Sequence, residues 1–258
     1  MPKQVRHMVQ GRLREATSMV YLSIIIPAYN EEKRVYATLT RAINYLSNKN
    51  YAYEIIVVDD GSTDGTPDII KTIINDRLVI IRNPVNQGKG SSVRRGVLAS
   101  CGEIILFSDA DLSADIAEMD KLLPWFDKGY DVVIGSRAAA DSTIGLRQPW
   151  HRVLMGKTFN LLVRAFILKG FRDTQCGFKC FKRDAAMKIF NLQRLSGFAF
   201  DVETLFIADR LGFKIKEAGV VWKNSPESKV HLVKGSLSML LDLFKIRFYH
   251  GKIRAGLR

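Results

Sequence analysis

The sequence is poor in the features that mark secreted, disulfide-stabilised or membrane-spanning proteins. It has three cysteines in 258 residues, Cys101, Cys176 and Cys180. This small, odd count indicates reduced thiols in a cytosolic compartment. No cysteine or histidine pair lies close enough in the chain to complete a zinc site with Cys176 and Cys180. We therefore expect these cysteines to pack in the core.

Long apolar runs are also missing. No segment approaches the roughly 20 consecutive apolar residues that span a bilayer. Residues 1–19 are polar and basic, without the apolar run of a signal peptide. We expect a cytoplasmic protein that is neither secreted through such a signal nor inserted across a membrane.

Acidic residues are scarce relative to basic ones. There are 26 Asp and Glu against 39 Lys and Arg, a formal net charge of +13. Such a balance favours anionic partners, which include nucleic acid, acidic lipid surfaces and phosphorylated substrates. Hydrophobic residues make up 47% of the chain, enough for a sizeable core. Charge alone does not choose among these partners.

Apolar runs alternate with helix-like segments through the first half of the chain. Because the runs are apolar on both faces, they predict an α/β fold with a largely parallel sheet covered by helices. Ligands bind beyond the carboxyl ends of such strands, so the polar clusters that follow the first, second and fourth strands should converge on one crevice. The expected strands are residues 22–27, 54–60, 78–83, 103–111 and 131–137.

Asp109 and Asp111 form the most informative motif. Two carboxylates two residues apart on an extended segment point to the same side. At a strand end they can share Mg²⁺ or Mn²⁺ with a diphosphate, and the metal would offset charge on a leaving group. A solvated acidic loop is the alternative for this short pattern.

Two further clusters suit a nucleoside. Asp59 follows the second apolar strand and precedes a tight turn, where its carboxylate could accept hydrogen bonds from a base or ribose. Asp60 beside it is equally typical of a turn. At the end of the first strand, Tyr29 could lie against a base and Glu31 could accept further hydrogen bonds, although Glu31 also suits a helix start.

Several cations could meet a phosphate. Lys89 sits in the glycine-rich segment 86–90, which opens a helix but lacks P-loop spacing, and Arg137 follows the fifth strand. Arginine holds phosphate through two parallel hydrogen bonds. For the later cations, a solvated surface position is the expectation for any one residue. They are Arg147, Arg152, Arg172, Lys179 and Lys229.

Asp201 and Glu203 stand two residues apart in an apolar setting. One of them could act as a base or orient a sugar hydroxyl. The alternative is a helix that begins here, with Asp201 as its cap and Glu203 in its first turn.

Two basic segments predict helices with broad apolar faces, residues 150–169 and 235–249. Along the second, apolar residues fall at Leu237, Leu240, Leu241, Phe244 and Phe248. Such helices can lie in the interface of a bilayer, and packing in the core is the alternative. The net charge favours the membrane.

Taken together, these motifs resemble those of glycosyltransferase family 2, whose members are inverting enzymes with the GT-A (Rossmann-like) fold. PAYNE, VVDDGSTDGT, NQGKG, DAD and GSR occur here in that family's order. The later strings RDTQCGFKCF, FAFDVE and ESK are similar to those of dolichyl-phosphate β-glucosyltransferases. The resemblance covers about residues 21–252.

The resemblance implies inverting transfer of glucose from UDP-glucose to a polyprenyl (dolichyl-type) phosphate, with Mg²⁺ or Mn²⁺ on Asp109 and Asp111. It divides the chain into a basic extension (1–20) and one GT-A domain (21–258). That domain has a nucleotide-sugar half to about residue 137 and an acceptor- and membrane-facing half beyond it. Catalytic roles fall to Asp109, Asp111, Asp201 and Arg137. The expected substrate-binding residues are Pro27, Ala28, Tyr29, Glu31, Asp59, Lys89, Asp109, Ala110, Arg172, Gln175, Ser228 and Lys229.

Three alternatives remain. The donor could be GDP-mannose or another UDP-sugar, or the acceptor could be a glycan hydroxyl, in which case Asp201 would be the base. A basic nucleic-acid-binding protein is a different class, but the sequence has no helix-turn-helix, RRM or zinc-finger pattern. We expect no nucleic acid and a peripheral position on the cytoplasmic face of an anionic membrane.

Overall fold

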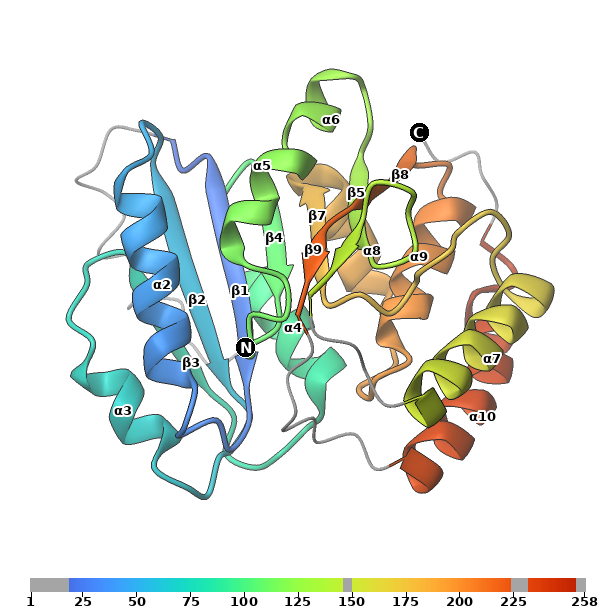
Figure 1. Cartoon of the computed structure of the whole chain (residues 1–258), viewed down its shortest axis with the longest axis horizontal. Helices are drawn as coiled ribbons and strands as arrows, with labels where there is room; N and C mark the ends of the chain where they lie inside the picture. Colours follow the sequence, from blue (N-terminus) through green and yellow to red (C-terminus); the bar gives the residue numbers. More distant parts are fainter. Residues whose placement is uncertain (1–18, 146–149, 224–231, 254–258) are drawn as a thin grey trace.

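The structure is a computed structural model, and it describes residues 19–145, 150–223 and 232–253. A seven-stranded sheet forms its centre, in the order β3-β2-β1-β4-β7-β5-β8 (Figure 1). Strand β7 runs antiparallel to both neighbours, and the other six strands run in one direction. The strands are β1 (Leu22–Ala28), β2 (Tyr53–Asp59), β3 (Leu78–Arg82), β4 (Ile104–Ser108), β5 (Val132–Ser136), β7 (Phe178–Lys182) and β8 (Ile215–Gly219).

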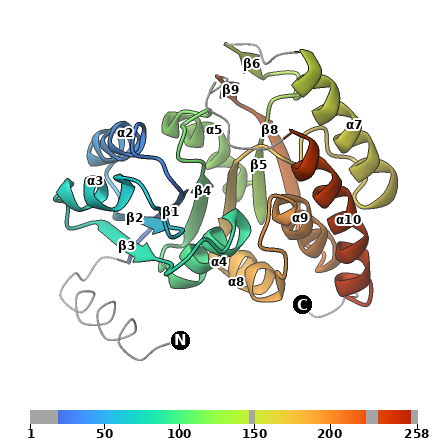
Figure 2. The same ribbon diagram turned by 90° about the horizontal axis from the view of Figure 1, so that it is seen from below.

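Helices cover both faces of this sheet (Figure 2). One face packs against α2 (Val35–Ser47), α3 (Thr66–Thr72), η1 (Ile116–Glu118), α5 (Met119–Leu122) and α6 (Pro124–Asp127). The other packs against α4 (Lys89–Ala99), α8 (Arg183–Leu192), α9 (Phe200–Arg210) and parts of α7 (Trp150–Phe166) and α10 (Leu232–His250). A small parallel pair, β6 (Thr143–Ile144) and β9 (Val221–Trp222), lies beside β5 and β8.

The apolar strands explain this layering. All seven residues of β1 and all seven of β2 are buried, and alternate side chains enter opposite cores. Ile25 and Val58 join the core under α4, whereas Ile24 and Val57 join the core under α2. A strand buried on both faces belongs in a parallel sheet covered by helices, so the predicted fold class is confirmed.

The carboxyl ends of β1, β2, β4 and β5 form one edge of the sheet. Ala28 pairs with Asp59 across β1 and β2. Because β7 is antiparallel, its first residue, Phe178, pairs with the last residue of β4, Ser108. The segment before β7 therefore arrives at the same edge as the polar clusters that follow β1, β2 and β4.

Strand β7 and helix α8 were not among the expected elements. The segment 172–181 has no long apolar run, and the charged Lys179 lies within the strand. Its pairing with β4 and β5 decides its conformation, and that pairing joins residues far apart in the chain.

Candidate active site

Asp109 and Asp111 lie immediately after β4, in a turn. The prediction of an extended segment through Asp111 was wrong, since the strand ends at Ser108 and Leu112 has a positive φ of 46°. The Asp109 amide donates to the Gly177 carbonyl at 3.0 Å, and Oδ1 of Asp111 accepts from the Ser113 amide at 2.9 Å. The turn, rather than strand alternation, sets the direction of each carboxylate.

Gly177 gives Asp109 the room that it occupies. A Cβ at residue 177 would stand 2.0 Å from Oδ2 of Asp109. Any side chain there would displace the carboxylate, which accounts for the glycine before β7.

The ammonium of Lys89 reaches Asp109. Its Nζ lies 2.6 Å from Oδ1 of Asp109, and the Lys89 side chain is 19% exposed. Burial on its own would lower the pKa of Lys89, but the nearby carboxylates of Asp109 and Asp201 outweigh it and raise that pKa. Lys89 therefore stays charged at the strand ends.

Asp60 positions the segment that carries Lys89. Its carboxylate accepts hydrogen bonds from Asn83 Nδ2 at 2.6 Å, from the Gln87 amide at 2.9 Å and from the Gly88 amide at 2.8 Å. Gly88 has a φ of 93°, and a Cβ there would meet the Ser196 carbonyl at 2.4 Å. Asp60 is thus a buried anchor for the glycine-rich turn.

The segments after β1 and β2 are tied together. The Asn30 amide donates to Ser62 Oγ at 2.9 Å, and the Glu31 amide donates to Thr66 Oγ1 at 2.6 Å. Asp59 is buried, accepts from the Ser62 amide at 3.0 Å and lies 3.1 Å from Arg82 Nε. These contacts bring the two proposed nucleoside segments to one place.

The other proposed nucleoside residues differ in exposure. Pro27 and Ala28 are buried at the end of β1, and the Ala28 carbonyl accepts from the Asp60 amide at 2.8 Å. Ala110 is 6% exposed, and its carbonyl accepts from Thr38 Oγ1 at 2.5 Å. Tyr29 is 38% exposed, and Glu31 pairs with Arg34 at 2.6 Å. Their roles toward a nucleotide stay predictions.

Lys179 is a buried residue, and the expectation of a solvated surface cation was wrong for it. Its side chain is 0% exposed, and Nζ lies 2.6 Å from the Cys176 carbonyl and 2.5 Å from Oδ1 of Asp201. Burial raises the pKa of Asp201 despite the opposing charges of Lys179 and Lys89. Lys179 reaches Asp201 because it lies in β7, and the sequence around Lys179 does not indicate that the side chain is buried.

Arg137 is engaged by a carboxylate of the chain itself. Its Nε and Nη2 donate to the two oxygens of Asp173 at 2.7 and 2.8 Å. Burial would raise the pKa of Asp173, but the Arg137 guanidinium outweighs it and lowers that pKa. The Asp173 amide donates to Glu217 at 2.8 Å. Arg137 therefore joins the end of β5 to the segment before β7.

The remaining acceptor-side residues are only partly described. The Arg172 side chain is exposed, and Gln175 Nε2 donates to the Phe198 carbonyl at 3.4 Å. Ser228 and Lys229, like Arg147, lie outside the described residues. Their proposed roles stay predictions.

Glu203 has a structural role in this arrangement. It is fully buried in α9, accepts from the Arg194 and Leu195 amides at 2.9 and 2.8 Å, and contacts His250 Nε2 at 2.7 Å. It joins the segment 194–197 to the end of α10. The Ser196 carbonyl in that segment accepts from the Gly90 amide at 2.7 Å, next to Lys89.

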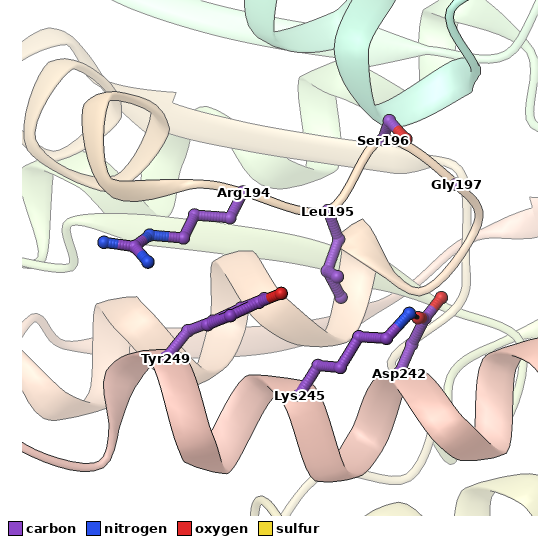
Figure 3. Close-up of a pocket in the computed structure, with 7 residues that line it drawn as sticks. All are labelled: Arg194, Leu195, Ser196, Gly197, Asp242, Lys245 and Tyr249. Carbon is purple, nitrogen blue, oxygen red and sulfur yellow. Dashed lines mark hydrogen bonds and ion pairs between the residues drawn. The ribbon is translucent and has the colours of Figure 1, made fainter.

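A cavity of about 450 Å³ lies between the segment 194–197 and α10 (Figure 3). Asp242, Lys245 and Tyr249 line it from the helix, and Lys245 pairs with Asp242 at 2.8 Å. Neither Asp109 nor Asp111 lines it, so this cavity is not the site predicted from the sequence.

The donor set after β4 suits a hard divalent cation. Asp109 and Asp111 provide two carboxylates, and the described residues contain no group of three or more potential His, Cys, Asp or Glu ligands. Mg²⁺ usually binds one or two carboxylates together with water and substrate phosphate. The residues present therefore fit a cation that a diphosphate completes.

Comparison with known proteins agrees with this arrangement. The family model described as glycosyl transferase family 2 matches residues 23–190, which contain the carboxyl ends of β1, β2, β4 and β5. The chain belongs to glycosyl transferase family 2.

Relatives within this glycosyltransferase family extend over most of the chain. It is 35% identical to the dolichyl-phosphate β-glucosyltransferase of Dictyostelium discoideum, covering 89% of this chain and 74% of that protein. It is 36% identical to the human protein of the same name and 36% identical to that of Saccharomyces cerevisiae. Each match covers 88% of this chain and 74% of the relative.

Solved structures support the GT-A fold. Glucosyl-3-phosphoglycerate synthase of Mycobacterium tuberculosis in complex with UDP has a TM-score of 0.64 at 20% identity, covering 92% of this chain and 82% of that one. The same synthase with Mn²⁺, UDP-glucose and phosphoglyceric acid has a TM-score of 0.62 at 21% identity, covering 91% and 82%. At 20–21% identity, this similarity shows a shared fold and nothing further.

Proposed function

We propose that this glycosyltransferase transfers glucose from UDP-glucose to a polyprenyl phosphate of the dolichyl type, with inversion, and releases a β-linked lipid-phosphate sugar. The relatives named dolichyl-phosphate β-glucosyltransferase support this assignment. The ion pair between Lys179 and Asp201 is the structural observation that carries it.

That ion pair bears on the kind of acceptor. A hydroxyl acceptor needs a carboxylate free to take its proton. Asp201 is the candidate base near Asp109, but Lys179 holds its Oδ1 at 2.5 Å in a buried setting. A phosphate acceptor is already anionic and needs no base, so it matches a site in which the carboxylate is engaged.

The donor side of the proposal uses the edge of the sheet. Tyr29, Glu31 and Asp59, with the backbone of Pro27 and Ala28, would line the nucleoside pocket. Lys89 would contact the diphosphate. The UDP and UDP-glucose complexes of the mycobacterial synthase, which has the same fold, support a uridine donor.

Asp109 and Asp111 would hold Mg²⁺ or Mn²⁺. Solved complexes of the same synthase contain each of these ions with UDP. A divalent cation, when bound, neutralises charge that develops on the diphosphate leaving group. The carboxylates orient it, and Ala110 between them fixes the turn through its carbonyl contact with Thr38.

The acceptor phosphate would attack the anomeric carbon from the face opposite UDP. Two anions must then approach one another, so cations have to hold the acceptor in line. Arg172, Lys229, Gln175 and Ser228 are the residues proposed for this task. Arg137 would shape the same side of the site through Asp173.

A lipid acceptor agrees with the outer faces of α7 and α10. Leu241, Phe244 and Phe248 on α10 are 57%, 75% and 84% exposed. On α7, Leu161 and Phe166 are 64% and 59% exposed. The two helices run side by side (Figures 1 and 2), and Arg247 Nη1 donates to the Phe166 carbonyl at 2.7 Å.

This surface would rest on the cytoplasmic face of an anionic membrane. Exposed Arg164, Lys169 and Arg247 flank the apolar side chains, and basic amphipathic helices bind such interfaces. No helix in the described part of the chain is long and apolar enough to span a bilayer. We propose a peripheral association through these exposed apolar and basic side chains.

A donor and acceptor screen tests the function. UDP-glucose and GDP-mannose are titrated calorimetrically with Mn²⁺, and products formed with a short polyprenyl phosphate are identified by mass spectrometry. We expect UDP-glucose to bind and a single hexose to be added to the lipid phosphate. Binding of GDP-mannose alone would move the enzyme to mannosyl transfer, and transfer to a glycan hydroxyl alone would overturn the lipid assignment.

A further inference from the structure

Two buried or partly buried ion pairs, each of one lysine and one aspartate, lie at the end of β4. Lys89 Nζ lies 2.6 Å from Asp109 Oδ1, and Lys179 Nζ lies 2.5 Å from Asp201 Oδ1. The ring of Phe107 is shared, with its centroid 5.4 Å from the Lys89 ammonium and 5.5 Å from that of Lys179. The two lysines are therefore neighbours in one apolar setting.

Asp109 is one of the two carboxylates suited to the cation, yet its Oδ1 already contacts an ammonium. Among the described residues, that buried oxygen has no hydrogen-bond partner apart from this ion pair. A divalent cation and an ammonium cannot both approach the same oxygen closely, because their charges repel strongly at such distances. A cation that binds through Oδ1 of Asp109 therefore has to displace Lys89.

We propose that Lys89 occupies the cation's position on Asp109 in the ligand-free enzyme and transfers to the diphosphate when the nucleotide and the cation bind together. The inference rests on the cation and donor roles proposed above. It makes Lys89 a positioning residue that couples binding of the cation to binding of the nucleotide.

The two lysines differ in their freedom to move. Lys179 is 0% exposed and is held by both the Cys176 carbonyl and Asp201. Lys89 is 19% exposed, has one ion-pair partner in the described part of the chain, and extends on a four-carbon side chain past the rings of Phe198 and Phe200. Burial and two contacts thus hold Lys179 on Asp201, so Lys89 is the lysine available for exchange.

The backbone around Lys89 is anchored, so the exchange involves its side chain. The Gly88 amide donates to Asp60 at 2.8 Å and the Gly90 amide donates to the Ser196 carbonyl at 2.7 Å. These bonds hold the first turn of α4 in place on both sides of Lys89. The ammonium can swing from a carboxylate to a phosphate without moving the turn.

Competition of this kind couples the two ligands. The cation alone must displace Lys89 without offering it a new anion, so it binds weakly. A diphosphate supplies that anion, and each ligand then tightens the other by the same factor. Without Lys89 this part of the coupling disappears, and only direct contact between cation and phosphate remains.

Titration of the full-length protein with Mn²⁺ in the absence of nucleotide tests the proposal. Binding is followed by calorimetry and by the electron paramagnetic resonance signal of free Mn²⁺. We expect Lys89→Met to bind Mn²⁺ alone about ten- to a hundredfold more tightly than the parent protein. Lys49→Met is the matched control, since it removes an ammonium 2.8 Å from a carboxylate, Asp120, outside the site.

Two further measurements keep the result specific. Adding Asp109→Asn to Lys89→Met should abolish the tightened binding. The factor by which UDP tightens Mn²⁺ should be smaller in Lys89→Met than in the parent. Thermal unfolding verifies folding, and Lys89→Gln, which should behave in the same way, replaces Lys89→Met if that variant does not fold.

Unchanged Mn²⁺ affinity in both folded Lys89 variants, or tight Mn²⁺ binding by the parent protein without nucleotide, would overturn the proposal. No sugar acceptor enters these titrations. An enzyme that uses another acceptor could therefore still show the exchange, and a lipid-phosphate glucosyltransferase could lack it.

Discussion

At the scale of single residues, the candidate site depends on which charge each carboxylate meets. Asp109 and Asp111 are partly exposed at the strand ends, whereas Asp60 and Glu203 are buried and accept backbone amides. Carboxylates of the second kind hold loops in place. The first kind has the partial exposure that contact with a cation or substrate requires.

Asp111→Asn should therefore remove catalysis while the fold persists. An amide oxygen lacks the charge that holds a divalent cation on a diphosphate. We expect turnover to fall by about two to four orders of magnitude, with an unchanged circular dichroism spectrum. Chelation with EDTA should have a similar effect on the parent protein, and full activity in either case would exclude the metal role.

Asp201→Asn separates the two acceptor chemistries. If Asp201 only pairs with Lys179, an amide oxygen still accepts from the ammonium, and we expect turnover to fall by less than about tenfold. A general base, by contrast, contributes about 10²–10⁴-fold. Steady-state rates on folded protein decide between them, and a loss above a hundredfold would favour a hydroxyl acceptor.

Lys179→Met should strongly destabilise the protein. It leaves the Asp201 carboxylate buried without a partner, which costs about 3–5 kcal/mol of unfolding free energy. Chemical denaturation measures the change. Lys179→Met combined with Asp201→Leu should recover much of that loss, since a buried apolar pair replaces the lone charge. A Lys179→Met protein as stable as its parent would show that the ion pair is not buried as described.

At the scale of elements, α10 has three faces with different environments. Leu243 and Ile246 are buried against the core, and Asp242 with Lys245 lines the cavity. Phe244 and Phe248 project outward, 75% and 84% exposed. An apolar stripe on a basic helix that the core does not bury is typical of an interfacial helix.

Changing Phe244 and Phe248 to Ser should weaken binding to anionic liposomes. Each phenyl group contributes about 1.5–3 kcal/mol when fully buried, so we expect the partition coefficient to drop at least tenfold. Because neither side chain packs in the core, the unfolding midpoint should hardly change. Co-sedimentation at two salt concentrations measures both the apolar and the electrostatic parts.

Tyr36→Ser is the matched control, since this exposed aromatic residue lies on α2, away from α7 and α10. It should leave liposome binding unaltered. If the parent protein does not bind liposomes at low salt, the two phenylalanines do not contact a membrane, and the case for a lipid acceptor is weaker.

At the scale of the whole molecule, the proposed donor joins segments that are distant in the chain. The carboxyl ends of β1, β2 and β4 and the first turn of α4 meet at the proposed donor site. A ligand that binds only the assembled edge stabilises the folded state by about 2.7 kcal/mol at a hundred times its Kd.

UDP with Mn²⁺ should consequently raise the thermal unfolding midpoint. For a chain of this size the rise is about 5–10 °C at that concentration. UDP without a divalent cation, and GDP with Mn²⁺, should produce much smaller shifts in differential scanning fluorimetry. A larger shift with GDP would contradict the uridine assignment.

The sequence by itself determined the fold class, the family and the presence of two carboxylates at the carboxyl end of the fourth strand, but not the turn that holds them. Strands that are apolar on both faces are buried between two layers of helices. Local motifs such as VVDDGSTDGT contain the end of such a strand and the polar turn that follows it. These features depend on residues that are close together in the chain, so the sequence alone specifies them.

Only the tertiary structure decided which charges meet. Strand β7 enters between β4 and β5 from the opposite direction, and it brings Gly177 against Asp109 and Lys179 against Asp201. Lys89 reaches Asp109 across 20 residues of sequence because α4 begins at the same edge. The sequence does not show whether a lysine is exposed or buried, because the tertiary packing around it determines its partner.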